Sequence, residues 1–180
     1  ADIKIFDDQG HEKPTGEQGT IYMLMSELSR FEYKGDKEKT EKDRFGDYFT
    51  AGDIGYLNDQ GFLFLCDRKI DMIISGGANI YPAEIENILI THPSVADCSV
   101  FGIPNDEWGE EVKAAVLLIP AVQQSDPLHD DILAYCAERL AKMKLPRSID
   151  YMEVLPRDPN GKLYKRKLRD PYWVGRDRQV

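Results

Sequence analysis

The segment DRKIDMIISGGANIYPAEIE, Asp67–Glu86, decides how the rest of the chain is organised. Its apolar run, Met72–Ile74, predicts a strand, and the paired Gly76 and Gly77 predict a turn in which positive φ is allowed. Pro82 and the AEIE that follows it predict a helix, because proline suits the first helical turn. Free N–H groups in such a turn can hold an anion or a polar chain. An ordinary glycine turn is the alternative on this segment alone.

The pattern of apolar residues changes at Asp67 and predicts two domains in an α+β chain. Residues 1–66 are expected to be β-rich, with strands at 2–6, 20–25, 48–50, 54–57 and 61–65 and a solvated loop with a short helix at 26–47. Residues 67–180 are expected to form a small sheet flanked by helices, with strands at 72–75, 95–103, 112–119 and 148–154 and helices at 82–90, 128–143 and 162–168.

The composition predicts a globular protein that works in a reducing compartment. The chain has 180 residues, a formal net charge of −9 and 42% hydrophobic residues. Cys66, Cys98 and Cys136 lie far apart without a CxxC, which supports neither a disulfide framework nor a zinc site. We expect no signal peptide, no membrane span and a cytoplasmic location, although the first residue is not Met and the chain could belong to something longer.

Two residues near the predicted domain junction could contact a nucleotide. Asp53 follows Gly52 in the turn FTAGD, where a carboxylate could accept two hydrogen bonds from a diol such as ribose. An Asx turn is the alternative for Asp53. The guanidinium of Arg68 could bind the nucleotide, or it could form a surface ion pair with Asp67 or Asp71.

The loop PRDPNGK, Pro156–Lys162, carries the strongest candidate for catalysis. It could project the Lys162 ammonium against a reacting phosphate or carboxylate, where a preorganised positive charge would stabilise a charged transition state. An ordinary surface lysine near a helix start is the alternative. Trp108, in a polar loop, could stack on a base or plug a domain edge.

The segment Lys142–Arg169 is basic against an acidic background, so Lys144 and Arg147 could meet phosphates or could lie on a solvated face. Binding of nucleic acid by this segment fits poorly with the net negative charge, and its test would be salt-dependent DNA binding. The sequence shows no P-loop, no nucleophile elbow and no spacing typical of metal ligands, so we predict no metal site in this chain.

Four stretches in this order resemble the adenylate-forming superfamily, which includes acyl-CoA synthetases, luciferases and the adenylation domains of peptide synthetases. They are FTAGD (49–53), DRKIDMIISGGANIYPAEIE (67–86), HPSVADCSVFGIPNDEWGEEVKA (92–114) and LPRDPNGK (155–162). The resemblance covers residues 3–173 of this chain but only the last part of a family enzyme. IISGGANIYPAEIE and GKLYKRKLRD are most similar to fatty-acyl or related acyl-CoA ligases.

The resemblance implies an acid–thiol ligase that works in two steps. ATP and a carboxylic acid, here a fatty acid by resemblance, give an acyl-adenylate and pyrophosphate, and the thiol of CoA then displaces AMP. Residues 67–180 would be a C-terminal lid that rotates between the steps, and residues 1–66 would end the large AMP-binding domain. ATP, Mg²⁺ and CoA are the expected cofactors and co-substrates, with the ligands of Mg²⁺ in the absent part of the large domain.

The family's functional residues map onto this chain by motif. Asp53 and Arg68 would bind ATP or AMP, and Lys162 would bridge the carboxylate and the α-phosphate. Gly76, Gly77, Ala78, Trp108, Lys144 and Arg147 would contact CoA. The hinge would comprise Lys69, Ile70 and Asp71. Lysines in such a loop are acylation targets in the family, so a lysine acyltransferase is an expected partner at Lys162, and acylation would remove its charge.

Two departures from the family pattern concern the binding turn and the hinge. The chain reads TAGD where the family usually reads TGD, and Ile70 stands where the hinge residue is usually Asp or Lys. The family's phosphate loop and acyl pocket belong to the large domain and are absent, so we expect the fragment alone to be inactive. The alternatives are a free-standing binding or regulatory module built on the lid fold, and an adenylation domain with a different acceptor. The absent domain could also bring a peripheral membrane contact.

Overall fold

The computed structural model describes residues 2–25, 41, 43–176 and 178, and it divides into two compact units, Ala1–Ile70 and Asp71–Val180. The second unit begins at Asp71, a few residues beyond the boundary expected at Asp67. Residues 67–70 stay with the first unit because Asp67 and Arg68 continue its last strand and the Lys69 N–H donates to the Gly52 carbonyl at 2.7 Å.

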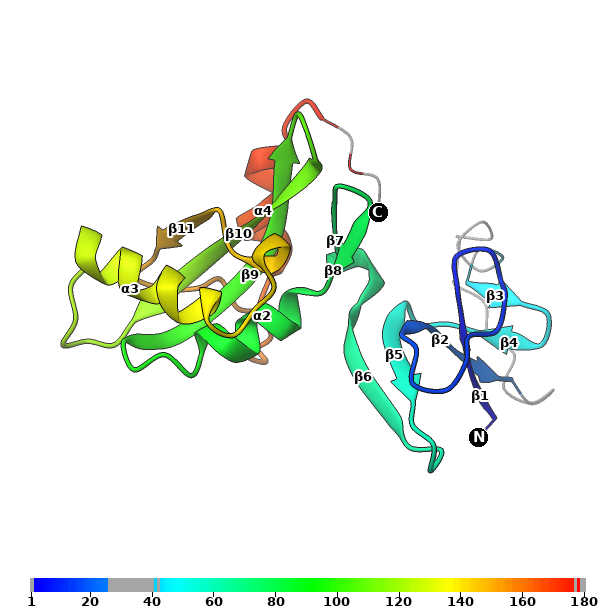
Figure 1. Ribbon diagram of the computed structural model, residues 1–180. Helices are drawn as coiled ribbons and strands as arrows, with labels where there is room; N and C mark the ends of the chain where they lie inside the picture. The colour runs from blue at the N-terminus through cyan, green and yellow to red at the C-terminus, as the bar shows by residue number, and fades with distance from the viewer. Residues whose placement is uncertain (1, 26–40, 42, 177, 179–180) are drawn as a thin grey trace. The chain divides into compact units, whose positions relative to one another are not determined.

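The N-terminal unit is an antiparallel sheet in the order β3-β4-β2-β5-β6, with β1 paired to β2 (Figure 1). Its buried apolar side chains come from β1, β2 and β5, of which β1 and β5 both pair with β2. Ile5, Ile21 and Ile54 lie in the resulting core. The strands are β1 (Ile3–Phe6), β2 (Gly19–Leu24), β3 (Arg44–Phe45), β4 (Tyr48–Phe49), β5 (Asp53–Leu57) and β6 (Leu63–Arg68).

The strands predicted for the N-terminal unit are present, with one addition. The two-residue strand β3 was not expected, because Arg44 and Phe45 lie at the end of a charged stretch. Most of the loop predicted at 26–47 lies outside the described residues. The NDQG signal does close the β5–β6 hairpin: the Asn58 side-chain oxygen accepts hydrogen bonds from the N–H groups of Gln60 (3.1 Å) and Phe62 (2.9 Å).

The C-terminal unit has a five-stranded sheet around a long hairpin of β9 (Val95–Asn105) and β10 (Gly109–Leu118). Strand β11 (Ser148–Tyr151) pairs parallel to β10. The short hairpin of β7 (Ile73–Ser75) and β8 (Ala78–Ile80) joins β10 where Ser75 faces Gly109.

Helices cover both faces of this sheet (Figure 1). Helices α2 (Pro82–Leu89) and α3 (Asp126–Ala137) pack through Ile85, Leu89 and Ile132 onto one core, and the short α4 (Lys165–Arg169) packs onto another. Successive residues of a strand face opposite ways, so Val100 enters the first core and Phe101 the second. Burial on both faces also explains why the neighbouring β10 reads as a nearly continuous apolar run, with Ala114 in the first core and Ala115 in the second.

Three expectations for the C-terminal unit are wrong in detail. The glycine turn leads into β8 and not directly into a helix, because Gly76 (φ 57°) and Gly77 (φ 79°) form the two-residue turn of a hairpin. Helix α3 ends at Ala137, and a separate turn of 3₁₀ helix, η3 (Lys142–Lys144), follows. The last helix begins at Lys165, since Arg157 and Leu163 form a β-bridge that keeps Lys162 in a loop.

The C-terminal tail folds back onto the second unit after η4 (Asp170–Trp173). The Trp173 indole N–H donates to the Gly102 carbonyl at 3.0 Å, and Arg178 donates to Glu110 at 3.1 Å. Burial raises the pKa of the Glu110 carboxyl, and the neighbouring Arg178 opposes that shift. No helix among the described residues is long and apolar enough to span a bilayer.

Candidate functional site

The loop that carries Lys162 is closed by the side chain of Asp158. One Asp158 carboxylate oxygen accepts hydrogen bonds from the N–H groups of Asn160 (2.8 Å) and Lys162 (2.9 Å). The Asp158 N–H donates to the Lys162 carbonyl at 2.8 Å, and Gly161 supplies a positive φ of 84°. Lys162 is exposed, so the loop fixes its backbone while its ammonium faces solvent.

The two ends of this loop are joined to each other and to the body of the C-terminal unit. The Tyr164 N–H donates to the Pro156 carbonyl at 2.8 Å, which closes the base of the loop. Lys165 forms an ion pair with Glu86 of α2 at 2.9 Å, and both side chains are largely buried. Partly buried charge pairs are screened less than surface pairs, so this contact holds the loop's C-terminal end.

Asp53 and Arg68 face each other across the β5–β6 pair in the N-terminal unit. Arg68 Nε lies 3.5 Å from an Asp53 carboxylate oxygen, and both side chains are partly exposed. The turn before Asp53 depends on Thr50 and not on an Asx turn at Asp53: the buried Thr50 hydroxyl accepts from the Gly52 N–H at 3.0 Å. The Asp53 carboxylate and the Arg68 guanidinium can therefore present one acceptor and one donor group side by side.

The structure brings Trp108 onto the glycine hairpin. A Cβ added to Gly76 would lie 2.6 Å from Trp108 Cε3, and the Gly76 N–H donates to the Trp108 carbonyl at 2.8 Å. The expectation of free N–H groups in this turn is therefore wrong for Gly76. Gly77 has open space around it, and nearly half of the Trp108 side chain stays exposed. A flat ligand could still contact this aromatic surface.

Lys144 and Arg147 have different surroundings. Lys144 in η3 donates to both carboxylate oxygens of Glu84 in α2, at 2.8 and 2.7 Å. The Arg147 side chain is exposed, and its N–H donates to the Val112 carbonyl of β10 at 2.8 Å. Lys144 therefore joins η3 to α2, and its charge is already paired with a carboxylate.

The predicted hinge residues divide between the two units. Lys69 Nζ contacts Asp8 at 2.5 Å within the first unit, and Asp71 lies 3.8 Å from the buried Arg169 within the second. Ile70 lies between them, with about half of its surface exposed (52%). Each flanking residue is thus attached to its own unit, and all three residues lie in the 3₁₀ turn η2 (Lys69–Asp71).

Potential metal ligands do not cluster in the part of the chain that the structure describes. Within residues 2–25, 41, 43–176 and 178, no group of three or more His, Cys, Asp or Glu side chains could hold a metal ion. These residues therefore do not fit a Mg²⁺ site.

Sequence reasoning missed the acidic partners of the basic residues. Glu84, Glu86 and Asp97 each pair with a cation that lies roughly 60 or more residues further along the chain. The AEIE motif was the available signal for two of them, because Glu84 and Glu86 flank the buried Ile85 and so lie along the two edges of the apolar face of α2.

Residues 84–162 match the family model of the AMP-binding enzyme C-terminal domain. The chain is 38% identical to a fatty acid–[acyl-carrier-protein] ligase, ScoC, of Streptomyces coeruleorubidus over 98% of this chain and 33% of that protein. It is also 38% identical to the long-chain-fatty-acid–CoA ligase FadD13 of Mycobacterium tuberculosis, over 95% of this chain and 33% of the relative. The chain therefore spans about a third of the length of these curated relatives.

Among solved structures, the ATP-bound RpMatB-BxBclM chimera B1 is similar to this chain with a TM-score of 0.87 and 33% sequence identity. The match covers 95% of this chain and 34% of the chimera. The sequence similarity to the curated relatives and the structural similarity to this chimera therefore both extend over nearly the whole chain.

Proposed function

Because this chain contains an AMP-binding enzyme C-terminal domain and belongs to the adenylate-forming superfamily, we propose that it is the C-terminal part of an ATP-dependent acyl-CoA synthetase. The whole enzyme would activate a carboxylic acid, a fatty acid in our proposal, as an acyl-adenylate. CoA thiol would then displace AMP. Because the chain spans about a third of its curated relatives, the fragment alone is expected to form no acyl-adenylate.

The observation that carries this proposal is the exposed Lys162 on a loop fixed by Asp158. In adenylation a carboxylate oxygen attacks the α-phosphorus of ATP, the bond to the bridging oxygen breaks, and pyrophosphate leaves. Negative charge is then concentrated on the carboxylate and the α-phosphate, where an ammonium stabilises the transition state most. A fixed backbone lowers the entropic cost of placing that ammonium.

The role proposed for Asp53 and Arg68 is to hold the nucleotide. The Asp53 carboxylate can accept from both hydroxyls of a ribose, and the Arg68 guanidinium can donate to a hydroxyl or a phosphate oxygen. The 3.5 Å pair between them fixes the two groups in one orientation before ATP binds.

The role proposed for the β7–β8 hairpin is to line the path of the CoA arm. Gly77 leaves the room for a pantetheine chain that a side chain would fill, and Ala78 adds only a methyl group. Trp108 offers an exposed aromatic surface beside them, suited to stacking on the adenine of CoA. Arg147 can meet a CoA phosphate, whereas Lys144 would first have to release Glu84.

The second candidate acceptor is the phosphopantetheine arm of a carrier protein. The chain is as similar to a fatty acid–[acyl-carrier-protein] ligase as to a CoA ligase, 38% identical in each case, so the comparisons support both acceptors equally. Both acceptors end in the same thiol, so they are distinguished by supplying the intact enzyme with CoA or with a loaded carrier protein. Thioester formed only with the carrier protein would contradict the CoA assignment.

The proposed function is tested on the intact enzyme by carboxylate-dependent exchange of pyrophosphate into ATP. A panel of short, medium and long fatty acids should support exchange. Asp53→Ala should raise the KM for ATP and lower kcat/KM by about tenfold or more, since a bidentate charged contact is lost.

The matched control is Asp59→Ala, an exposed carboxylate in the turn of the same hairpin. It should leave the exchange unchanged. Pyrophosphate exchange without an added carboxylic acid would contradict the proposed activation of an acid. Exchange that is as insensitive to Asp53→Ala as to Asp59→Ala would contradict the nucleotide role of Asp53.

A further inference from the structure

We propose that Arg157, held by Asp97, is a positioning residue that fixes the Lys162 loop on the sheet for adenylation. The inference deepens the proposed function and rests on it. Arg157 lies inside the same loop, five residues before Lys162, and Asp97 lies near the start of β9.

The Arg157 guanidinium joins two elements with two different nitrogens. Nη1 donates to the carbonyl of Gly161, the residue directly before Lys162, at 2.7 Å. Nη2 donates to the Asp97 carboxylate. Because both contacts come from one planar group, the position of the Gly161–Lys162 peptide is set by the position of Asp97.

Asp97 is itself fixed on the sheet. Its other carboxylate oxygen accepts from the Cys98 N–H at 2.9 Å, and its side chain is only 28% exposed. Strand β9 belongs to the core of the C-terminal unit, so Asp97 is a rigid anchor. Asp158 shapes the loop internally, whereas Arg157 is the side chain that joins its tip to the sheet.

This arrangement predicts an effect on one half-reaction. Without the guanidinium, Asp158 would still close the turn, but its tip could move relative to β9 and carry Lys162 away from the reacting groups. Displacements of about 1 Å can cost about 100-fold in rate. Thioester formation from supplied acyl-adenylate should be spared, because the proposed CoA path at Gly77 and Trp108 does not include Arg157.

The test uses the intact enzyme with Arg157→Gln and measures both half-reactions separately. We expect kcat for adenylation to fall about 10- to 100-fold with little change in KM, and thioester formation to stay within about twofold. Arg157→Lys keeps a charge and a donor but cannot bridge in the same plane, so it should give an intermediate rate. Asp97→Asn should lower adenylation in the same direction as Arg157→Gln.

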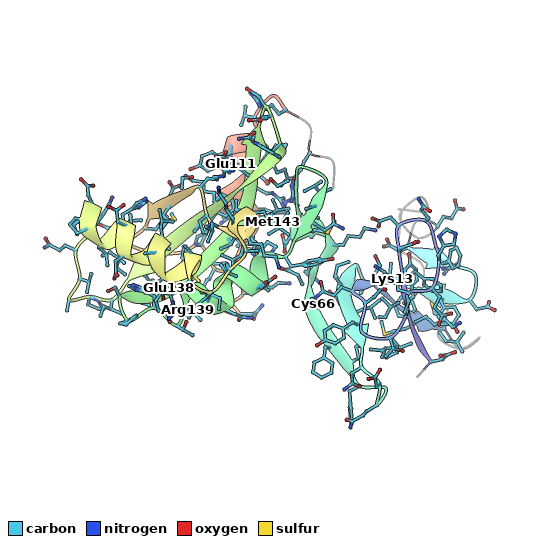
Figure 2. All side chains as sticks on the ribbon, viewed as in Figure 1. Lys13, Cys66, Glu111, Glu138, Arg139 and Met143 are labelled. Atoms are coloured by element: carbon cyan, nitrogen blue, oxygen red, sulfur yellow. The ribbon has the colours of Figure 1, made fainter. Side chains whose placement is uncertain are left out.

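Arg139→Gln is the matched control. The Arg139 guanidinium also donates to a backbone carbonyl (Tyr135, 2.8 Å) and a carboxylate (Glu138, 2.9 Å), with similar exposure (37% against 43% for Arg157). Figure 2 shows Glu138 and Arg139 together, and both follow the end of α3, outside the Lys162 loop. This control should leave both half-reactions unchanged.

Amide hydrogen exchange of the peptide 156–165 in the same enzymes gives a readout that does not depend on activity. Exchange should be faster in Arg157→Gln than in wild type or in Arg139→Gln, while exchange in β9 and β10 stays unchanged. Unchanged adenylation, or equal loss of both half-reactions, would overturn the positioning role. If Lys162→Ala is inactive in adenylation but Arg157→Gln is not, only this inference fails. If Lys162→Ala is fully active, the catalytic assignment itself fails.

Discussion

At the scale of single residues, the two glycines of the β7–β8 turn have different requirements. Both have positive φ, a conformation that costs other residues about 1–2 kcal/mol. Gly76 has a second constraint, because Trp108 occupies the space of its missing side chain, whereas Gly77 has none. The backbone explains both glycines, and only the tryptophan contact explains why Gly76 is also sterically confined.

We therefore expect Gly76→Ala to destabilise the chain more than Gly77→Ala. The second substitution should cost about 1–2 kcal/mol from backbone strain alone, and the first should cost more because Trp108 must move. Urea unfolding followed by tryptophan fluorescence would measure both. Equal losses of stability would contradict the tight contact between Gly76 and Trp108.

How far the sequence predicts a residue's surroundings depends on the separation of its partners. Pro82 at the start of α2 was predictable, because its role depends on neighbours within one turn. The pairs Lys144–Glu84 and Arg157–Asp97 were not, since their members lie 60 residues apart. The candidate residues could thus be named from motifs, whereas their supports required the fold.

At the scale of elements, α2 is attached to β9 by polar contacts as well as by its apolar face. The Glu86 carboxylate accepts a hydrogen bond from the Val100 N–H at 2.7 Å, and the Cys98 thiol donates to the Glu86 carbonyl at 3.5 Å.

Short strands were harder to predict from the sequence than helix α2. The strand Ala78–Ile80 has only three residues, too few for a pattern of alternation that differs from a loop, and the sequence therefore predicts that the glycine turn leads straight into α2.

Burial raises the pKa of the Cys98 thiol to about 12, and Glu86 adds to the shift. Below about pH 8.5 the thiol is protonated in both states, so its contribution to stability is complete. Between about pH 8.5 and 12 only the unfolded chain loses the proton, and the free energy of unfolding falls as the pH rises.

Cys98→Ala should therefore flatten the fall in stability between pH 8 and 10, by about 2 kcal/mol. Denaturant unfolding at several pH values would measure the slope. Cys66→Ala, at a half-buried position of β6, is the control and should have a smaller effect on the slope. The same slope in wild type and Cys98→Ala would contradict the buried, protonated thiol.

At the scale of the whole molecule, each unit has its own sheet and buried residues. The second unit has cores on both faces of its sheet, and Asp71 at its start is fixed by Arg169 near its end. The sequence changes from β-rich to alternating elements near Asp67, whereas the two units of the structure divide after Ile70. Backbone contacts such as that of Lys69 with Gly52, which join residues 17 positions apart, attach residues 67–70 to the first unit.

Residues 71–180 should therefore fold without the first unit. We expect this fragment to unfold in a single cooperative thermal transition and to keep the circular dichroism of a helix-and-sheet protein. A broad, non-cooperative transition would show that the first unit is needed to complete its core.

The central claim is that Lys162 serves adenylation, and the most direct test compares the two half-reactions in the intact enzyme carrying Lys162→Ala. Lys167→Ala, which removes an exposed lysine of α4, is the control. The account predicts that Lys162→Ala lowers acyl-adenylate formation by about 100-fold or more while thioester formation from supplied acyl-adenylate survives. Equal rates of adenylate formation in Lys162→Ala, Lys167→Ala and wild type would contradict it.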